Sequence, residues 1–126
     1  MNQKNLDIFK TPISIQRLQH SEEQIMNLKK KCLSWKKRSM GLAKSNNYGW
    51  HSEPTFFRQD DQILKAFGKL FIQAAADFTA QIAPDLVIDN LNWEGQGWIN
   101  INSKGSFNAP HDHPGFLWSG VFYVDI

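Results

Sequence analysis

The sequence contains a single cysteine, Cys32, and no run of apolar residues long enough to cross a membrane. One cysteine excludes an internal disulfide and is typical of proteins in a reducing compartment. A membrane-spanning helix needs about 20 consecutive apolar residues, and the N-terminal "MNQKNLDIF" lacks the apolar core of a signal peptide. Repeats and low-complexity segments are absent as well. We therefore expect a cytoplasmic protein with no membrane partner.

The composition indicates one folded domain. The 126 residues are 41% hydrophobic and 21% charged, which is ordinary for a globular protein and argues against disorder. A chain of this length can form one domain with a core but is short for two. Five Trp and nine Phe are a large share for this length. We expect these rings mainly in the core, with an aromatic-lined pocket as the alternative.

Positive charge is concentrated in one segment. Six of the fourteen Lys and Arg residues lie between positions 29 and 38, around Trp35. Such a cluster could bind nucleic acid through phosphate contacts and stacking. It could also be the solvated face of an amphipathic helix, whose basic end lies near the negative end of the helix dipole. No base-reading motif accompanies the cluster, so the helix interpretation is favoured and we expect no nucleic-acid partner.

Apolar residues at helical spacing predict two helices. Ser21 and Gln24 form a capping-box pattern, and apolar residues follow three and four positions apart, at Ile25, Leu28, Cys32 and Trp35. Gly41 and "KSNNYGW" interrupt this pattern. A second helix is predicted from an N-cap near Asp60 to Pro84, which ends it. Its apolar stripe is Ile63, Phe67, Leu70, Phe71, Ala74, Phe78 and Ile82.

The chain after Pro84 predicts strands. "DLVIDNLNWEGQGWININ" is rich in β-branched and aromatic residues, and Trp98, Asn100 and Asn102 alternate with isoleucines. "SKGSFNAPHDHPG" is a turn-rich connection, and "FLWSGVFYVDI" predicts a strand apolar enough to be buried on both faces. With short strands expected before the helices, this order indicates an α+β fold in which helices cover one side of an antiparallel sheet.

Two histidines, His111 and His113, flank Asp112 in the turn-rich loop. In an extended segment residues two apart point to the same side, so both imidazoles could reach one metal ion while Asp112 faces away. Imidazole suits Fe, Zn, Cu and Ni, but a catalytic zinc site or a non-haem iron triad needs a third protein ligand. The alternative is ordinary polar chemistry in a surface turn. His20 and His51 are expected to be surface or locally hydrogen-bonded residues and not the third ligand.

Three motifs favour the metal site over the ordinary surface turn. They are "W-x-N-x-N" from Trp98 to Asn102, "G-x-x-N-x-x-H-x-H-P-G" from Gly105 to Gly115, and "S-G-V-F-Y-V" from Ser119 to Val124. Together they resemble the 2-oxoglutarate/Fe(II)-dependent oxygenases of marine bacteria and their phages. Weaker matches are "LDIFKTPI" near the N-terminus and "GWHS" from Gly49 to Ser52.

The resemblance implies helices packed on a double-stranded β-helix (jelly-roll) core of which only the first strands are present. One incomplete domain would span residues 1–126, with helical support at about 20–83 and jelly-roll strands at about 86–126. The implied cofactors are Fe(II) and 2-oxoglutarate, and the implied activity couples oxidative decarboxylation of 2-oxoglutarate to hydroxylation of a small-molecule or protein substrate. In this family an H-x-D/E pair and a distal histidine hold the iron.

By position, His111 matches the first iron ligand and His113 falls where the carboxylate usually lies. An imidazole there removes one negative charge from around the iron. Asp112, one residue out of register, stays a minor alternative ligand. By the same resemblance, Asn102 and Tyr123 would contact 2-oxoglutarate.

The family's distal histidine and its basic 2-oxoglutarate-binding residue cannot be located in this sequence, and a jelly roll of about eight strands does not close on its first strands alone. We therefore expect a fragment that is inactive as a dioxygenase by itself. The alternative is a jelly-roll binding module without catalysis. Neither interpretation indicates an oligomeric state.

Overall fold

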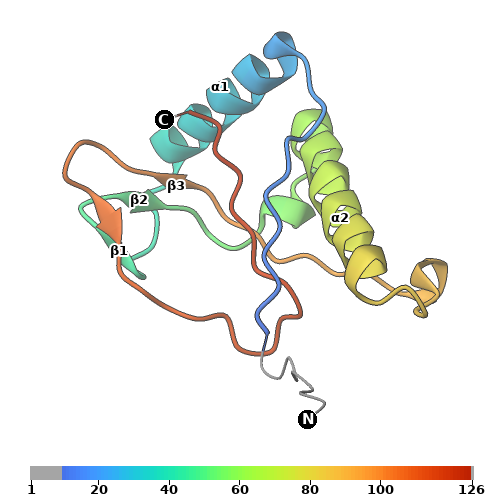
Figure 1. The fold of residues 1–126 in the computed structure, drawn as a ribbon. Coiled ribbons are helices and arrows are strands. Elements are labelled where there is room, and N and C mark those ends of the chain that lie inside the picture. The colour runs from blue at the N-terminus through green and yellow to red at the C-terminus, as the bar shows by residue number, and fades with distance from the viewer. Residues whose placement is uncertain (1–9, 126) are drawn as a thin grey trace.

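The computed structural model describes residues 10–125 as two helices and two small antiparallel pairs of strands (Figure 1). The helices are α1 (Glu22–Arg38) and α2 (Gln62–Ile82), and short 3-10 turns occur at η1 (Phe56–Arg58) and η2 (Ile88–Asn90). The strands are β1 (Asn46–Asn47), β2 (Trp50–His51), β3 (Asn100–Ile101) and β4 (Phe107–Asn108). Within the described part of the chain, neither helix is both long and apolar enough to pass through a bilayer.

Helix α1 begins with the predicted capping box. The Ser21 hydroxyl accepts a hydrogen bond from the Gln24 amide at 3.1 Å, and the Gln24 side chain accepts from the Ser21 amide at 2.7 Å. These two bonds satisfy backbone donors that have no partner within the helix. The helix ends in a basic turn, where positive charge faces the negative end of the dipole. The predicted helix is confirmed at both ends.

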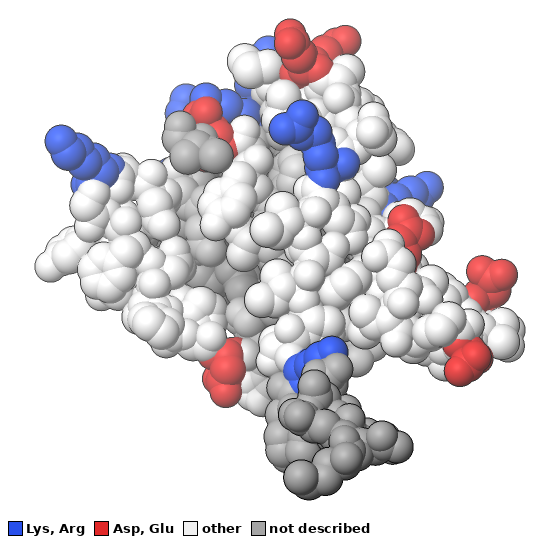
Figure 2. All heavy atoms as spheres, viewed as in Figure 1, with Lys and Arg blue, Asp and Glu red and all other residues white. Residues whose placement is uncertain are grey.

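Two lysines of the basic segment of α1 form ion pairs with acidic residues elsewhere in the chain. Lys29 pairs with Asp125 and Lys31 pairs with Asp61, each at 2.5 Å. On the face drawn in Figure 2, Lys and Arg side chains are spread over several separate places, with Asp and Glu side chains between some of them. Two of the six clustered cations are therefore engaged with acidic side chains of this chain.

Helix α2 begins near Asp60, as predicted. Asp61 is the N-cap, because its carboxylate accepts hydrogen bonds from the amides of Ile63 at 2.9 Å and Leu64 at 3.2 Å. The neighbouring Asp60 pairs instead with Lys65. The helix ends at Ile82, before Pro84, as predicted. Ile82 is exposed, so the predicted stripe is not buried along its whole length.

The core lies where both helices meet the β2–β3 pair and η1. Its buried members are Leu28, Cys32, Trp50, Phe56, Leu64, Phe67 and Ile99. Phe67, Phe71 and Phe122 contact one another with ring centroids 5.3–6.2 Å apart, in the tilted arrangements that aromatic pairs prefer. Burial raises the pKa of the Cys32 thiol to about 11, so this cysteine stays an unreactive thiol at neutral pH.

The strand pairs join two segments that lie far apart in the sequence. β1 pairs with β4, Asn46 opposite Asn108, and β2 pairs with β3, His51 opposite Asn100. The backbone bonds continue beyond the strands: the Ala109 amide donates to the Ser45 carbonyl at 2.8 Å and the Ser52 amide to the Ile99 carbonyl at 2.9 Å. Residues 45–56 therefore run antiparallel to residues 97–109.

The strand predicted in "FLWSGVFYVDI" is wrong for residues 116–125. Nothing in this described segment is a strand, and Leu117, Val121 and Tyr123 are well exposed. Phe122 and Val124, by contrast, pack on the core. This alternation is typical of extended backbone, but a strand also needs a neighbouring strand for its hydrogen bonds, and the segment lies beside α1 and the N-terminal coil instead (Figure 1).

Other strand predictions are met only in part. Residues 10–20 contain no strand, and the first half of "LDIFKTPI" lies outside the described residues. In the range 86–125, β3 and β4 are the strands, with two residues each. Pairs this short do not test the jelly-roll fold, which stays a prediction.

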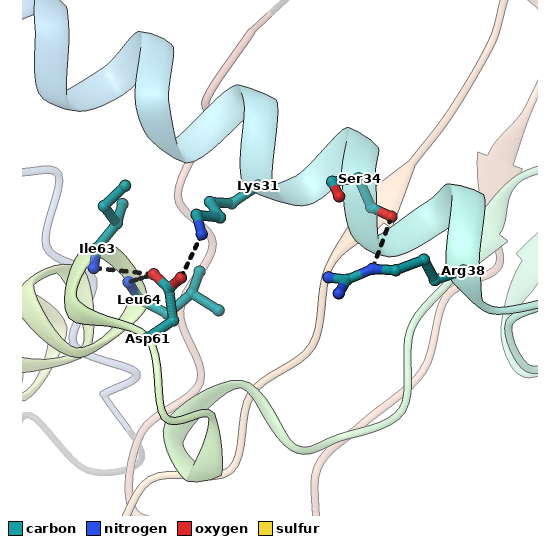
Figure 3. A network of polar contacts seen from close by, with 6 residues as sticks. All are labelled: Lys31, Ser34, Arg38, Asp61, Ile63 and Leu64. Atoms are coloured by element: carbon teal, nitrogen blue, oxygen red, sulfur yellow. Dashed lines mark hydrogen bonds and ion pairs between the residues drawn. The ribbon is translucent and has the colours of Figure 1, made fainter.

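Replacing Asp61 should test how α2 is held on α1. The Asp61 carboxylate caps α2 and also binds the Lys31 ammonium of α1 at 2.5 Å (Figure 3). We expect Asp61→Ala to lower the free energy of unfolding in urea by about 1–2 kcal/mol, the range for a lost N-cap. Asp60→Ala is the matched control, with an expected change of about 0.5 kcal/mol or less because Asp60 is exposed. Equal losses would contradict this assignment.

The same carboxylate gives stability a pH dependence. The hydrogen bond from Lys31 holds the pKa of Asp61 below its usual value. A lowered pKa in the folded state adds stability above the unfolded carboxyl's pKa of about 3.9, and that stability is lost as the pH falls below it. The Asp61→Ala variant should therefore differ less from the original protein at pH 3 than at pH 7.

Candidate functional site

The pairing of residues 45–56 with residues 97–109 builds one pocket. The Ala109–Ser45 bond brings residues 44 and 45 beside the start of the histidine loop. The Ser52–Ile99 bond and a bond from the Phe56 amide to the Gly97 carbonyl, at 3.0 Å, place residues 51–54 along residues 96–98. The pocket between them has a volume of about 380 Å³. Its lining is Lys44, Ser45, His51, Pro54, Gln96, Trp98, His111, Asp112 and His113.

His111 and His113 lie together in this pocket. Their ring centroids are 4.8 Å apart and the rings are perpendicular, at 89°. The His111 Nδ1 bonds to the Ala109 carbonyl at 2.7 Å, and because a carbonyl can only accept, Nδ1 carries the proton. The lone pair of the neutral ring is then on Nε2. Metal-binding histidines have this same arrangement, with the second ring nitrogen donating to a backbone carbonyl.

A third protein ligand does not join the two rings. Across residues 10–125, no three His, Cys, Asp or Glu side chains converge closely enough to hold a metal ion. Asp112 lines the pocket together with both histidines, whereas strict extended geometry would turn it away. The loop 109–114 contains no strand, so simple alternation does not apply to it. The two histidines fit two ligand positions around a metal ion, and the remaining positions would be filled by groups other than these two side chains.

His51 is the pocket residue that sequence reasoning set aside. It is locally hydrogen-bonded, as expected, through Nδ1 donation to the Ser52 carbonyl at 2.6 Å, but it is only 6% exposed and lines the pocket. Its ring stacks on Trp98 with centroids 5.4 Å apart and an angle of 16°. Trp98 in turn contacts His113 at 5.2 Å. Trp98 therefore lies between His51 and the histidine pair.

The other predicted site residues lie elsewhere. Asn102 is exposed, donates to the Asn108 side chain at 2.9 Å, and does not line the pocket. Tyr123 is 71% exposed and lines a separate hollow formed with residues 14–20. His20 lines that same hollow, with its ring against Phe67 and Phe122. The structure thus brings His111 and His113 together but not Asn102 or Tyr123.

Comparison with known proteins finds no matching family model, no matching curated protein and no matching solved structure.

Ser52 should be essential for the geometry of the pocket. It is fully buried, its hydroxyl donates to the Glu53 carbonyl at 2.8 Å, and it accepts from the Ile99 amide at 3.0 Å. We expect Ser52→Ala to lower the free energy of unfolding by about 1–3 kcal/mol, because it leaves a buried amide without a partner. Ser34→Ala, at an exposed position of α1, should change it little. Equal effects in urea denaturation would rule out this role.

Proposed function

We propose that this chain carries the metal-binding part of a 2-oxoglutarate- and Fe(II)-dependent dioxygenase, with His111 and His113 as iron ligands. The proposal includes the fold implied by the sequence motifs, in which helices pack on a jelly-roll core. One observation supports it above the others: the two imidazoles of the H-x-H motif lie 4.8 Å apart in a pocket, and His111 has its Nε2 free.

The chemistry of the pocket supports this choice. Imidazole nitrogen is a suitable ligand for Fe(II), and a volume of about 380 Å³ lies within the range of small-molecule sites. Bound iron would supply open coordination positions for the oxoacid and O₂. The protein's own part is to aim the two rings, through the Ala109 carbonyl and the Trp98 ring.

His113 stands where relatives of the proposed family have a carboxylate. Asp112 lines the same pocket, so it stays the alternative second ligand. The two can be separated by substitution, because His113→Ala removes the ligand in one case and Asp112→Asn removes it in the other. We place the activity in the cytoplasm, where reducing conditions keep iron ferrous.

A second candidate is a jelly-roll binding module that does not catalyse a reaction. The specific observation in its favour is that only two metal ligands converge in the described residues. Its ligand would be a small molecule or a protein held in the same pocket. This candidate and the dioxygenase differ in whether the pocket takes up Fe(II).

Metal uptake should depend on the histidine pair. We expect calorimetry with Fe(II) under anaerobic conditions, or with Co(II), to show one site whose affinity falls at least about 10-fold in His111→Ala and in His113→Ala, since each removes a ligand. His20→Ala is the matched control, because His20 lies in the other hollow. Unchanged uptake in the double variant His111→Ala/His113→Ala would end the proposal.

The chain by itself should not complete the dioxygenase reaction. A non-haem iron centre of this kind uses three protein ligands, and two converge here. With Fe(II), 2-oxoglutarate and O₂ we expect succinate to stay at the level of the protein-free control. Succinate well above that level, and abolished by His111→Ala, would show that the site is complete.

A further inference from the structure

Residues 117–124 form an extended segment whose backbone has no partner in the part of the chain that the structure describes. No amide or carbonyl of this segment forms a hydrogen bond there. Exposure alternates along the segment as it does along a strand. The exposed side chains of this alternation are Leu117, Ser119, Val121 and Tyr123. The segment therefore has the form of a strand and lacks a neighbouring strand.

The opposite face of the segment is fixed to the helices and the core. The Trp118 indole donates to the Thr79 hydroxyl of α2 at 2.8 Å. The Phe122 ring lies against Phe67, with centroids 5.7 Å apart, and Val124 packs on the core. Because these contacts already hold the segment in place, a second strand could pair with it at little further cost in chain entropy.

The middle of the segment is open. A methyl group added at Gly120 would meet no atom within 4 Å other than its neighbours in sequence, and a glycine within a strand lets another backbone approach closely. Val121 is 77% exposed and lines a hollow together with Tyr123 and with Ile15, which is also exposed. An unpaired backbone beside exposed apolar side chains is the combination by which a strand edge pairs with another chain.

We propose that residues 117–124 pair with the same segment of a second copy of this chain, antiparallel and about a two-fold axis. In such a pairing the middle of the segment lies at the axis, so Val121 is placed beside Val121 of the other copy. The exposed apolar side chains then form one surface shared by both copies. The same patch is used on both sides, which closes the assembly at two chains.

The charge pattern favours a second copy over a partner that is selected by charge. Residues 114–124 contain no charged side chain, so pairing with itself places no like charges opposite one another. The exposed apolar side chains of the segment and Ile15 present on the order of 500 Å² per copy, which is less than the about 800 Å² per partner of a standard interface. The expected dimer is therefore weak and depends on protein concentration.

Charged residues at position 121 test this pairing. Sedimentation velocity over a concentration series should show a monomer–dimer equilibrium for the original protein. Val121→Glu and Val121→Lys should each weaken association at least about 10-fold, because like charges then meet at the axis. Val87→Glu, at an exposed apolar position outside the segment, is the matched control and should associate like the original protein. Urea midpoints should confirm that all three variants fold.

A mixture of the two position-121 variants gives the sharpest result. Equal amounts of Val121→Glu and Val121→Lys should form a mixed dimer at least as tight as the original one, because opposite charges now meet. A mixture that stays monomeric overturns the two-fold pairing. An original protein that stays monomeric throughout the series, or that grows into assemblies without a limit, overturns it as well.

Hydrogen exchange tests whether the backbone takes part. Amides of residues 117–124 should exchange more slowly in the dimer than in Val121→Glu, because pairing supplies their missing acceptors. Unchanged exchange in this segment would place the association on another surface and overturn the inference.

This inference goes beyond the proposed function and does not depend on it. Residues 117–124 do not line the histidine pocket, and association is measured without metal. The double variant His111→Ala/His113→Ala should therefore lose metal uptake and still form the dimer, so failure of one proposal is distinguishable from failure of the other.

Discussion

The antiparallel pairing of residues 45–56 with residues 97–109 is the constraint on which the rest of this structure depends. Four residues of β1 and β2 and four of β3 and β4 form the regular part, and three flanking backbone bonds extend it. The buried hydroxyl of Ser52 adds a side-chain bond to the Ile99 amide. Because these bonds join segments about 50 positions apart, they determine which side chains share the pocket.

Contacts between aromatic and imidazole rings extend into the loop after Ala109, where the backbone hydrogen bonds between the two paired segments end. The loop from Ala109 to Pro114 contains no strand, yet His113 packs on Trp98, Trp98 stacks on His51, and His111 meets His113 edge to face. The rings that would hold a metal are thus also the rings that fix the loop to the paired segments, so site and local fold are stabilised together.

Aromatic residues lie both in the core and in the lining of the histidine pocket, and the composition does not show which residue lies where. Trp50, Phe56 and Phe67 are buried in the core, whereas Phe107 and Phe116 are more than half exposed. Trp98 lies in the pocket lining between two imidazoles instead. The alternation of "GWININ" placed Trp98 on one side with Asn100 and Asn102, but it did not indicate that imidazoles from two other segments would meet Trp98.

Local signals in the sequence determined the helices. The capping box at Ser21 and the apolar spacing after it involve residues within a few positions of one another, so they can be identified without the fold. The sequence placed the start of α2 near Asp60, where two neighbouring aspartates are both good caps, and in the structure Asp61 is the N-cap and also contacts Lys31 of α1. The H-x-H motif is local in the same way, and it identified His111 and His113 as a pair of imidazoles that lie together.

The tertiary structure determined the features that depend on contacts between residues distant in the sequence. Residues 116–125 have the composition of a strand but no strand beside them, and backbone hydrogen bonds between strands cannot be inferred from one segment alone. His51 and Lys44 entered the pocket through strand register, which a single sequence does not specify. The sequence therefore determined the helices and the histidine pair, and the pairing of distant segments decided what surrounds them.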